Sequence, residues 1–185
     1  MVSRAINFAF AHNGNIPDTA ALEEYLQERR YVTGKYNDSE LLGNAIASRV
    51  HSGRDLADAV EQAMEMVEGA YACVAMHDGT LVGFRDRFGI RPLDIGTFEG
   101  GVILASETCA LDTVGAKHLR SVEPGEIVVI RDGKIIASKQ AVKPNPKLDM
   151  FEFVYFARHD SYLYGQRLYE VRRTFGELLA KIHKP

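Results

Sequence analysis

A change in the spacing of apolar residues near residue 70 limits the folds open to this chain. Before it, apolar residues recur at helical spacing in three stretches, about 19–30, from Asn37 to His51, and from Asp55 to Gly69. After it, apolar runs are joined in pairs by the turn sequences Asp78-Gly79, Glu99-Gly100-Gly101 and Asp132-Gly133. Because helices and hairpins form separate runs, the sequence predicts an α+β fold with antiparallel sheet.

Length and composition exclude several classes of protein. At 185 residues, the chain is long enough for one full domain and too short for two large ones. A net charge of −3 gives no basis for binding nucleic acid, and no apolar run is long enough to span a membrane. Because Cys73 and Cys109 lie in apolar runs and no signal peptide is evident, we expect a reduced, cytoplasmic protein. The six histidines lack metal-ligand spacing, so no metal site is expected.

The segment Ala11-His12-Asn13-Gly14-Asn15 ends an apolar run over residues 5–11, which predicts a buried strand breaking into a sharp turn. Asn and Gly tolerate positive φ, so such a turn can direct a backbone N–H outward beside the Asn13 amide. A pair of neutral donors of this kind stabilises the oxyanion of acyl transfer. The alternative is a simple turn without function, because Asn-Gly turns are common.

Two interpretations also apply to Asn37-Asp38-Ser39-Glu40. The first is helix capping, in which Asn37 or Asp38 accepts from backbone N–H groups and Glu40 reaches back. The second is a carboxylate, Asp38, that binds the ammonium group of a ligand. Both hold if one residue caps the helix and the other faces a site.

Charged residues are dense between Arg85 and Leu93, where Arg–Asp pairs either lie on the surface or form buried bidentate pairs. The same alternatives apply to Ser106-Glu107, with Ser106 as a cap or Glu107 as a partner for one of those arginines. Residues 143–148 are the best linker candidate, and a last helix is predicted over about 168–182.

Seven motifs follow one another in an order that is typical of one enzyme family. They are Ala-His-Asn-Gly-Asn, Asn-Asp-Ser-Glu, Gly-Ala-Tyr-Ala-Cys-Val-Ala-Met, Arg-Asp-x-x-Gly-Ile-Arg-Pro-Leu, Ala-Ser-Glu-Thr-x-Ala-Leu-Asp, Pro-Gly-Glu and Phe-Glu-Phe-Val-Tyr-Phe-Ala-Arg-x-Asp-Ser. From about residue 8 to residue 182, the chain resembles the amidophosphoribosyltransferases. These enzymes use glutamine and phosphoribosyl pyrophosphate to make phosphoribosylamine, the first committed step of purine synthesis.

The resemblance implies an N-terminal-nucleophile glutaminase fold, with two antiparallel sheets between helical layers, present only in part. It implies that residues 1–142 are the C-terminal part of a glutamine amidotransferase domain, 143–148 a linker, and 149–185 the start of a phosphoribosyltransferase domain. It also implies roles for three residues. Asn13 and Gly14 would form the oxyanion hole of glutamine hydrolysis, and Asp38 would hold the α-amino group of glutamine.

The sequence departs from the family at several points. It begins Met1-Val2-Ser3-Arg4, without the family's N-terminal cysteine nucleophile or its carboxylate-binding arginine segment, so we expect the chain alone not to hydrolyse glutamine. The phosphoribosyl-pyrophosphate loop is also absent, so Mg²⁺ and phosphoribosyl pyrophosphate are expected only in a transferase domain outside this chain. Met150 replaces a cluster cysteine, so no iron–sulfur cluster is expected. An uncovered sheet face and edge predict poor solubility or homo-oligomers.

Two alternatives to this family assignment remain. One is another class-II amidotransferase such as an asparagine synthetase, against which the segment from Phe151 to Ser161 speaks. The other is a non-enzymatic module that binds glutamine weakly or pairs with a full-length subunit.

Overall fold

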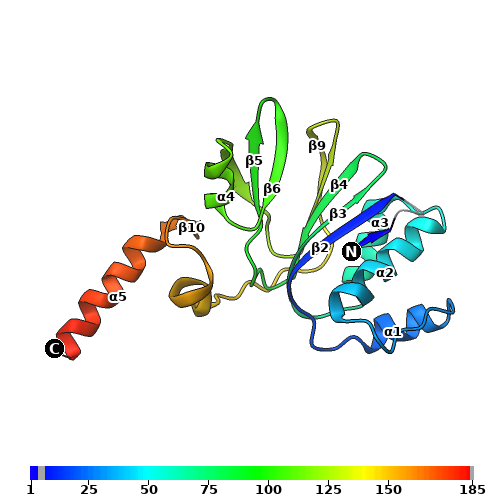
Figure 1. Ribbon diagram of the computed structural model, residues 1–185, viewed down its shortest axis with the longest axis horizontal. Coiled ribbons are helices and arrows are strands. Elements are labelled where there is room, and N and C mark those ends of the chain that lie inside the picture. The colour runs from blue at the N-terminus through cyan, green and yellow to red at the C-terminus, as the bar shows by residue number, and fades with distance from the viewer. Residues whose placement is uncertain (4–6, 184–185) are drawn as a thin grey trace.

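Two antiparallel sheets form the centre of the computed structural model, which describes residues 1–3 and 7–183 (Figure 1). The larger sheet has the strand order β1-β2-β3-β4-β8-β9. Its strands are β1 (Val2–Ser3), β2 (Phe8–Asn15), β3 (Ala70–His77), β4 (Thr80–Arg85), β8 (Glu126–Arg131) and β9 (Lys134–Gln140). The smaller sheet, with the order β6-β5-β7, consists of β5 (Asp94–Phe98), β6 (Gly101–Ala105) and β7 (Lys117–Ser121).

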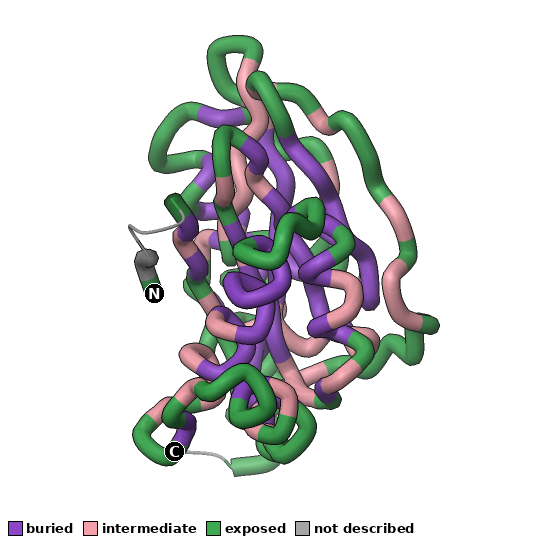
Figure 2. The backbone as a smooth tube through the Cα atoms, turned by 90° about the vertical axis from the view of Figure 1, so that its right-hand side faces the viewer, coloured by how far each residue is buried: buried purple, intermediate pink, exposed green. Residues whose placement is uncertain are grey.

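Three helices cover one face of the larger sheet (Figure 1). They are α1 (Ala20–Gln27), α2 (Asp38–His51) and α3 (Leu56–Met64). Their buried side chains pack against Phe10, Cys73 and Phe84 of the strands to form the larger hydrophobic core. Figure 2 shows that the buried backbone is concentrated along the middle of the molecule, with exposed loops at its ends.

A second hydrophobic core fills the space between the two sheets. Ala72 and Val128 of the larger sheet pack there with Leu93 and Ile95, which lie at the start of the smaller sheet. The short helix α4 (Thr108–Thr113) covers the outer face of the smaller sheet. The order of layers is therefore helices, sheet, sheet and helix, and the α+β architecture expected from the sequence is confirmed.

Tight turns join the strands where the sequence predicts hairpins. In the turns Asp78-Gly79, Glu99-Gly100 and Asp132-Gly133, both central residues have positive φ. This conformation matches the right-handed twist of the flanking strands, which explains the choice of Gly at the second position. The helix boundaries agree less well with those expected from the sequence than the turns do. Helix α1, for example, ends three residues earlier than expected. Strand β7 was not expected, because most of its residues are polar and exposed at a sheet edge.

The C-terminal segment is a smaller unit that lies beside the smaller sheet (Figure 1). It contains a π-helical turn, η1 (Glu152–Phe156), the hairpin β10 (Tyr162–Leu163) and β11 (Gln166–Arg167), and α5 (Leu168–Ile182). Its core is small and is formed by Phe153, Ala157, Leu163 and Leu168. The predicted helix over 168–182 is therefore present, but it extends away from the layered unit and exposes most of its apolar side chains.

The expected linker lies against the layered unit. The backbone N–H of Asn145 donates to the carbonyl of Arg87 at 2.8 Å, and that of Lys147 donates to the carbonyl of Phe88 at 2.9 Å. Residues 143–148 therefore join the two units and are hydrogen-bonded to the layered unit. Of the described helices, none combines the length and apolar character needed to cross a bilayer.

Candidate functional site

Strand β2 continues through Asn13 and Gly14, so the sharp turn expected there is wrong. Asn13 pairs with Ala72 of β3, and Gly14 pairs with Tyr71. Gly14 has φ +144°, and a Cβ atom on it would lie 1.9 Å from the carbonyl oxygen of Ala70. Pairing with β3 along the whole strand outweighs the local turn preference of Asn-Gly. Glycine is needed because the neighbouring backbone passes so close.

The backbone N–H of Gly14 nevertheless points away from the partner strand β3. Tyr71 turns both of its backbone groups toward Asp86: its N–H donates to Asp86 Oδ2 at 3.0 Å, and its carbonyl accepts from the Asp86 N–H at 2.9 Å. Two residues directly opposite each other in an antiparallel pair either bond with each other or both direct their N–H and C=O groups to the other side of their strand. Because Tyr71 directs its groups toward Asp86, its partner Gly14 belongs to the second kind. The N–H of Gly14 therefore points away from β3, toward the sheet edge on which Met1 bonds with Phe10.

Asp38 reaches the end of β2, while its neighbour caps the helix. Asn37 forms a capping box with Glu40: its side chain accepts from the Glu40 N–H at 2.9 Å, and its own N–H donates to Glu40 Oε2 at 3.0 Å. Asp38 Oδ2 accepts from the N–H of Ile16, the residue after β2, at 3.0 Å. The two interpretations of this motif are thus compatible. The structure brings Asp38 together with the end of the strand that carries Asn13 and Gly14.

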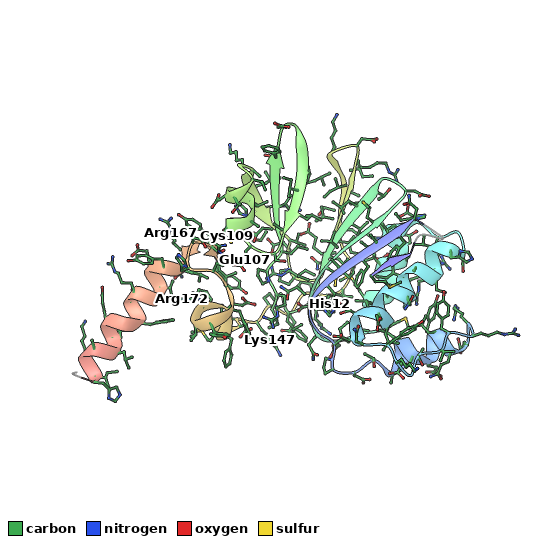
Figure 3. The ribbon with its side chains drawn as sticks, viewed as in Figure 1. His12, Glu107, Cys109, Lys147, Arg167 and Arg172 are labelled. Atoms are coloured by element: carbon green, nitrogen blue, oxygen red, sulfur yellow. The ribbon has the colours of Figure 1, made fainter. Side chains whose placement is uncertain are left out.

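His12 of β2, labelled in Figure 3, lies beside Asp38, and sequence reasoning did not connect it with the site. Its side chain is 2% exposed, and Nδ1 lies 2.7 Å from Ser39 Oγ and 4.0 Å from Asp38 Oδ2. Among the described residues, His12 Nε2 has no hydrogen-bond partner. Burial lowers the pKa of His12, and the negative charge of Asp38 opposes that shift only in part. The alternation along β2 could have signalled this position, because it places His12 on the same face as Phe10.

Neither cysteine is placed as a nucleophile for this corner. Cys73 is buried in β3, and burial, with Asp86 and Asp38 nearby, raises the pKa of its thiol well above the usual range. Cys109 is buried in α4, beside Glu107 and the C-terminal segment, and Figure 3 shows it well apart from His12. A nucleophilic cysteine needs an accessible thiolate. The prediction of two buried thiols is confirmed.

Two charged residues of the segment after β4, Arg85 and Asp86, bind backbone groups, which neither interpretation of the segment anticipated. The buried guanidinium of Arg85 donates to the carbonyls of Gly89, Arg91 and Val122 at 2.6–2.8 Å. Asp86 accepts from the N–H groups of Phe88 and Gly89 as well as Tyr71, and burial raises its pKa despite these bonds. A loop without internal ladder bonds needs such partners for its buried polar groups.

Two other charged residues hold the C-terminal segment. Arg91 forms a partly buried ion pair with Glu152 at 2.7 Å. Glu107 Oε2 accepts from the N–H of Arg158 and from Ser161 Oγ, both at 2.7 Å. Glu107 therefore binds the C-terminal segment, and the alternative that pairs it with an arginine of residues 85–91 is wrong among the described contacts.

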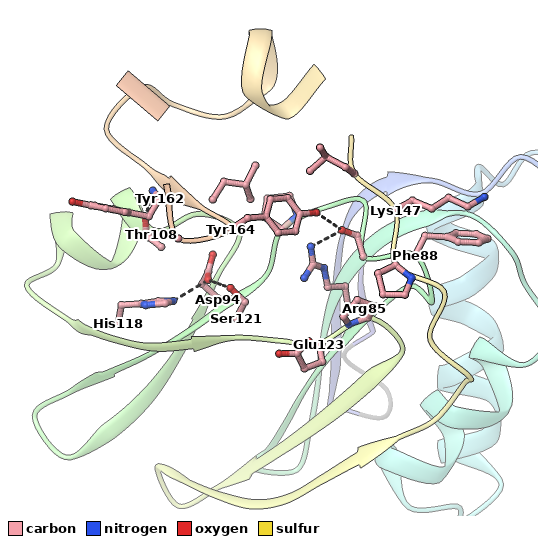
Figure 4. Close-up of a pocket in the computed structure, with 17 residues that line it drawn as sticks. Arg85, Phe88, Asp94, Thr108, His118, Ser121, Glu123, Lys147, Tyr162 and Tyr164 are labelled. Atoms are coloured by element: carbon pink, nitrogen blue, oxygen red, sulfur yellow. Dashed lines mark hydrogen bonds and ion pairs between the residues drawn. The ribbon is translucent and has the colours of Figure 1, made fainter. Parts of the chain in front are cut away.

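A cavity of about 600 Å³ lies between the layered unit and the hairpin β10–β11 (Figure 4). Phe88, Pro124 and Tyr164 supply apolar walls. On one side, the buried Asp94 accepts through Oδ1 from Ser121 Oγ at 2.7 Å and lies 3.0 Å from His118 Nε2. Asn13, Gly14 and Asp38 do not line this cavity. Among the described residues, no cluster of three or more His, Cys, Asp or Glu side chains could hold a metal ion.

Comparisons with known proteins place these observations in a family. A sequence model described as a glutamine amidotransferase domain matches residues 1–113. An amidophosphoribosyltransferase from Synechococcus elongatus is 41% identical over 177 residues, which cover 94% of this chain and 36% of that protein. One from Methanocaldococcus jannaschii is 34% identical over 192 residues, covering 96% of this chain and 41% of the relative.

Two solved structures match closely. A glutamine phosphoribosylpyrophosphate amidotransferase from Bacillus subtilis, complexed with ADP and GMP, superposes with a TM-score of 0.86 at 33% identity. That match covers 99% of this chain and 40% of the other. A structure described as the allosteric regulatory enzyme of purine biosynthesis gives a TM-score of 0.85 at 34% identity, covering 96% and 38%. The chain thus spans about two fifths of the length of these proteins.

Proposed function

The chain belongs to the glutamine amidotransferase domain family and is related to amidophosphoribosyltransferases, and on that premise we propose that the end of β2 is a glutamine site. The Asn13 amide and the Gly14 N–H stabilise the oxyanion of the glutamine γ-carbonyl, and Asp38 binds its α-amino group. The observation that carries this proposal is the contact between Asp38 and the end of β2. It brings the Asp38 carboxylate to the end of the strand that carries Asn13 and Gly14.

The chemistry of amide hydrolysis suits this corner. Attack on the glutamine amide produces a tetrahedral oxyanion, which donors fixed before the reaction stabilise better than mobile ones. Gly14 is fixed by strand pairing, and Asp38 is fixed by the N–H groups of Ile16 and Ser39. A carboxylate has about four acceptor positions, so these two bonds leave room for an ammonium group.

The proposed attacking thiolate does not come from the two cysteines of this sequence. Cys73 is kept neutral by burial, and Cys109 lies beside the C-terminal segment. An acyl-enzyme cannot form without an activated nucleophile. We therefore propose that a polypeptide of this sequence binds glutamine and does not hydrolyse it. This also accommodates the alternative of a glutamine-binding module or a partner of a longer subunit.

The longer relatives suggest an activity for a protein that contains this chain. The names of these relatives indicate transfer of ammonia from glutamine to phosphoribosyl pyrophosphate. We propose that a protein containing this chain catalyses that transfer, that residues 149–185 begin its phosphoribosyltransferase domain, and that it acts as a homo-oligomer in the cytoplasm.

Calorimetric titration of the purified chain with L-glutamine tests the proposed site. We expect measurable binding, and we expect Asp38→Ala to weaken it on the order of 30-fold, because the ammonium loses its anionic partner. Asp132→Asn is the matched control, since Asp132 lies in an exposed hairpin turn, and it should leave the affinity unchanged. Equal affinities for the unchanged chain and the Asp38→Ala variant would refute the assignment of the ammonium site.

Ammonia release from glutamine tests the absence of hydrolysis. We expect no release above background from the purified chain. Turnover that disappears in an Asn13→Ala variant would show that the chain is active, while still supporting Asn13 as an oxyanion donor.

A further inference from the structure

His12 is buried directly behind the proposed glutamine site, and the proposed function gives it no role. Its ring lies between β2 and the first turn of α2, where Nδ1 is 2.7 Å from Ser39 Oγ. Ser39 Oγ in turn lies 3.4 Å from Asp38 Oδ1. Three polar side chains thus form a line from the strand of Asn13 and Gly14 to the carboxylate of Asp38. A buried polar ring at such a point needs a reason, because burial costs free energy unless hydrogen bonds compensate.

The protons along this line can be arranged in two ways. If Ser39 donates to His12 Nδ1, then Asp38 loses the hydroxyl as a donor, and His12 Nε2–H is a buried donor without a partner among the described residues. If His12 Nδ1–H donates to Ser39 Oγ, the hydroxyl is free to donate to Asp38 Oδ1, and Nε2 is a buried acceptor without a partner among the described residues. Both arrangements leave Nε2 unpaired, but the second adds the hydrogen bond from Ser39 Oγ to Asp38 Oδ1, so it is favoured.

Electrostatics favours the same direction. The carboxylate of Asp38 lies 4.0 Å from His12 Nδ1, and a proton on that nitrogen faces the negative charge. Burial lowers the pKa of His12, which keeps the ring neutral at pH 7. A neutral ring donates one hydrogen bond without neutralising the carboxylate. Asp38 therefore keeps its charge for a ligand.

We propose that His12 is a positioning residue, which acts through Ser39 to hold the Asp38 carboxylate at a fixed place relative to Asn13 and Gly14. This proposal rests on the proposed glutamine site. It adds that the distance between the ammonium contact and the oxyanion donors is set by the chain His12–Ser39–Asp38, which ties β2 to α2. His12 itself does not touch the substrate.

A pair of variants separates positioning from packing. His12→Asn keeps a donor near the place of Nδ1 but loses most of the ring volume, whereas His12→Phe keeps the volume and loses the donor. If the hydrogen bond matters, Asn should retain affinity for L-glutamine close to that of the unchanged chain, and Phe should weaken it on the order of tenfold. Ser39→Ala should weaken affinity like Phe. A packing role predicts the opposite order, with Asn worse than Phe.

Two NMR measurements need no ligand. The nitrogen spectrum of His12 should show a proton on Nδ1 and none on Nε2. The Ile16 amide, which donates to Asp38 Oδ2, should exchange with solvent faster in His12→Phe and Ser39→Ala than in His12→Asn. A proton on Nε2, or equal exchange in all three variants, would overturn the proposal.

These readouts distinguish the two levels of the argument. If the unchanged chain does not bind glutamine, the proposed function fails, and the NMR data alone decide whether the hydrogen-bond chain exists. If it binds and His12→Phe binds equally well, the glutamine site stands and the positioning role is wrong.

Discussion

The end of β2 and the cavity beside the C-terminal segment use their polar groups in opposite ways. At the end of β2, Asn13 and Gly14 are exposed, and the side chain of His12 is buried beside Asp38 and Ser39. The cavity has a volume of about 600 Å³, but Arg85 and Asp94 in its wall are already bonded to other groups of the protein. Arg85 donates to three carbonyls there, and Asp94 bonds with Ser121. Volume alone therefore does not identify the site, because recognition needs donors and acceptors that a ligand can still use.

One loop connects the two regions. Asp86 binds the backbone of Tyr71, which pairs with Gly14, and Arg91 binds Glu152 of the C-terminal segment. The loop between them is held by Arg85. The polar contacts around the cavity thus hold the C-terminal segment in place, whereas the Asn13 amide, the Gly14 N–H and Asp38 at the end of β2 are the groups that we propose bind a ligand.

The largest effect is expected from removing Arg85. Arg85→Met keeps the length of the side chain but removes the guanidinium donors to three carbonyls, and should lower the free energy of unfolding by about 3–5 kcal/mol. Arg87→Met is the control, because Arg87 pairs with the exposed Glu68 and should cost less than about 1 kcal/mol. Urea unfolding measures both. Similar losses of unfolding free energy for the two variants would mean that the hydrogen bonds of Arg85 do not stabilise the fold more than a surface ion pair does.

A smaller loss is expected at Gly14. Gly14→Ala places a Cβ against the carbonyl of Ala70, so β2 and β3 must separate at their ends, and we expect a loss of about 3 kcal/mol. Gly53→Ala is the control: it also has positive φ, but a Cβ there meets open space, and its cost should be about 1 kcal/mol. Equal losses in urea unfolding would show that backbone conformation alone, rather than the close approach of β3, demands glycine at position 14.

The same contrast explains what the sequence could predict about the fold. Helix starts and hairpin turns depend on a few neighbouring residues, and Asn37, Asp55 and the three Gly-containing turns lie where local rules place them. Asn13-Gly14 obeys the same local rules but is overruled by pairing with β3, a partner almost sixty positions away. Strand β7 was missed because pairing with β5, rather than its own composition, makes it a strand.

The candidate site was predictable only in part. The motif order pointed to Asn13, Gly14 and Asp38, and the structure brings Asp38 to the strand that carries the other two. The bonds of Arg85 to Val122 and of Glu107 to Arg158 could not be predicted, because only the tertiary fold brings these backbone groups near. The link between His12 and Ser39 was missed for the same reason, since 27 positions separate them.

The stability of the protein should also depend on pH through His12, near the end of β2. Burial lowers the pKa of His12, so below about pH 6.5 the unfolded chain binds a proton that the folded chain does not. Stability should therefore fall between pH 7 and pH 5, by on the order of 1 kcal/mol from this group. His12→Phe should remove that part of the slope, and His51→Asn, at an exposed position of α2, should keep it. Identical slopes in urea unfolding for the two variants would contradict the prediction.

The smallest effect is expected from a change in the cavity. Asp94→Asn keeps the Oδ1 acceptor that bonds with Ser121 and lies near His118, so the fold should persist while one negative charge is lost. If the ligand binds at the end of β2, the affinity for L-glutamine should change by less than about twofold, within the scatter expected for a distant site. Amide shifts on adding glutamine should then cluster at Gly14, Ile16 and Ser39 and leave Ser121 unmoved. A loss of affinity as large as that of Asp38→Ala, with shifts at Ser121, would reverse the comparison, because the cavity would then be the binding site and the outward donors of β2 would have another use.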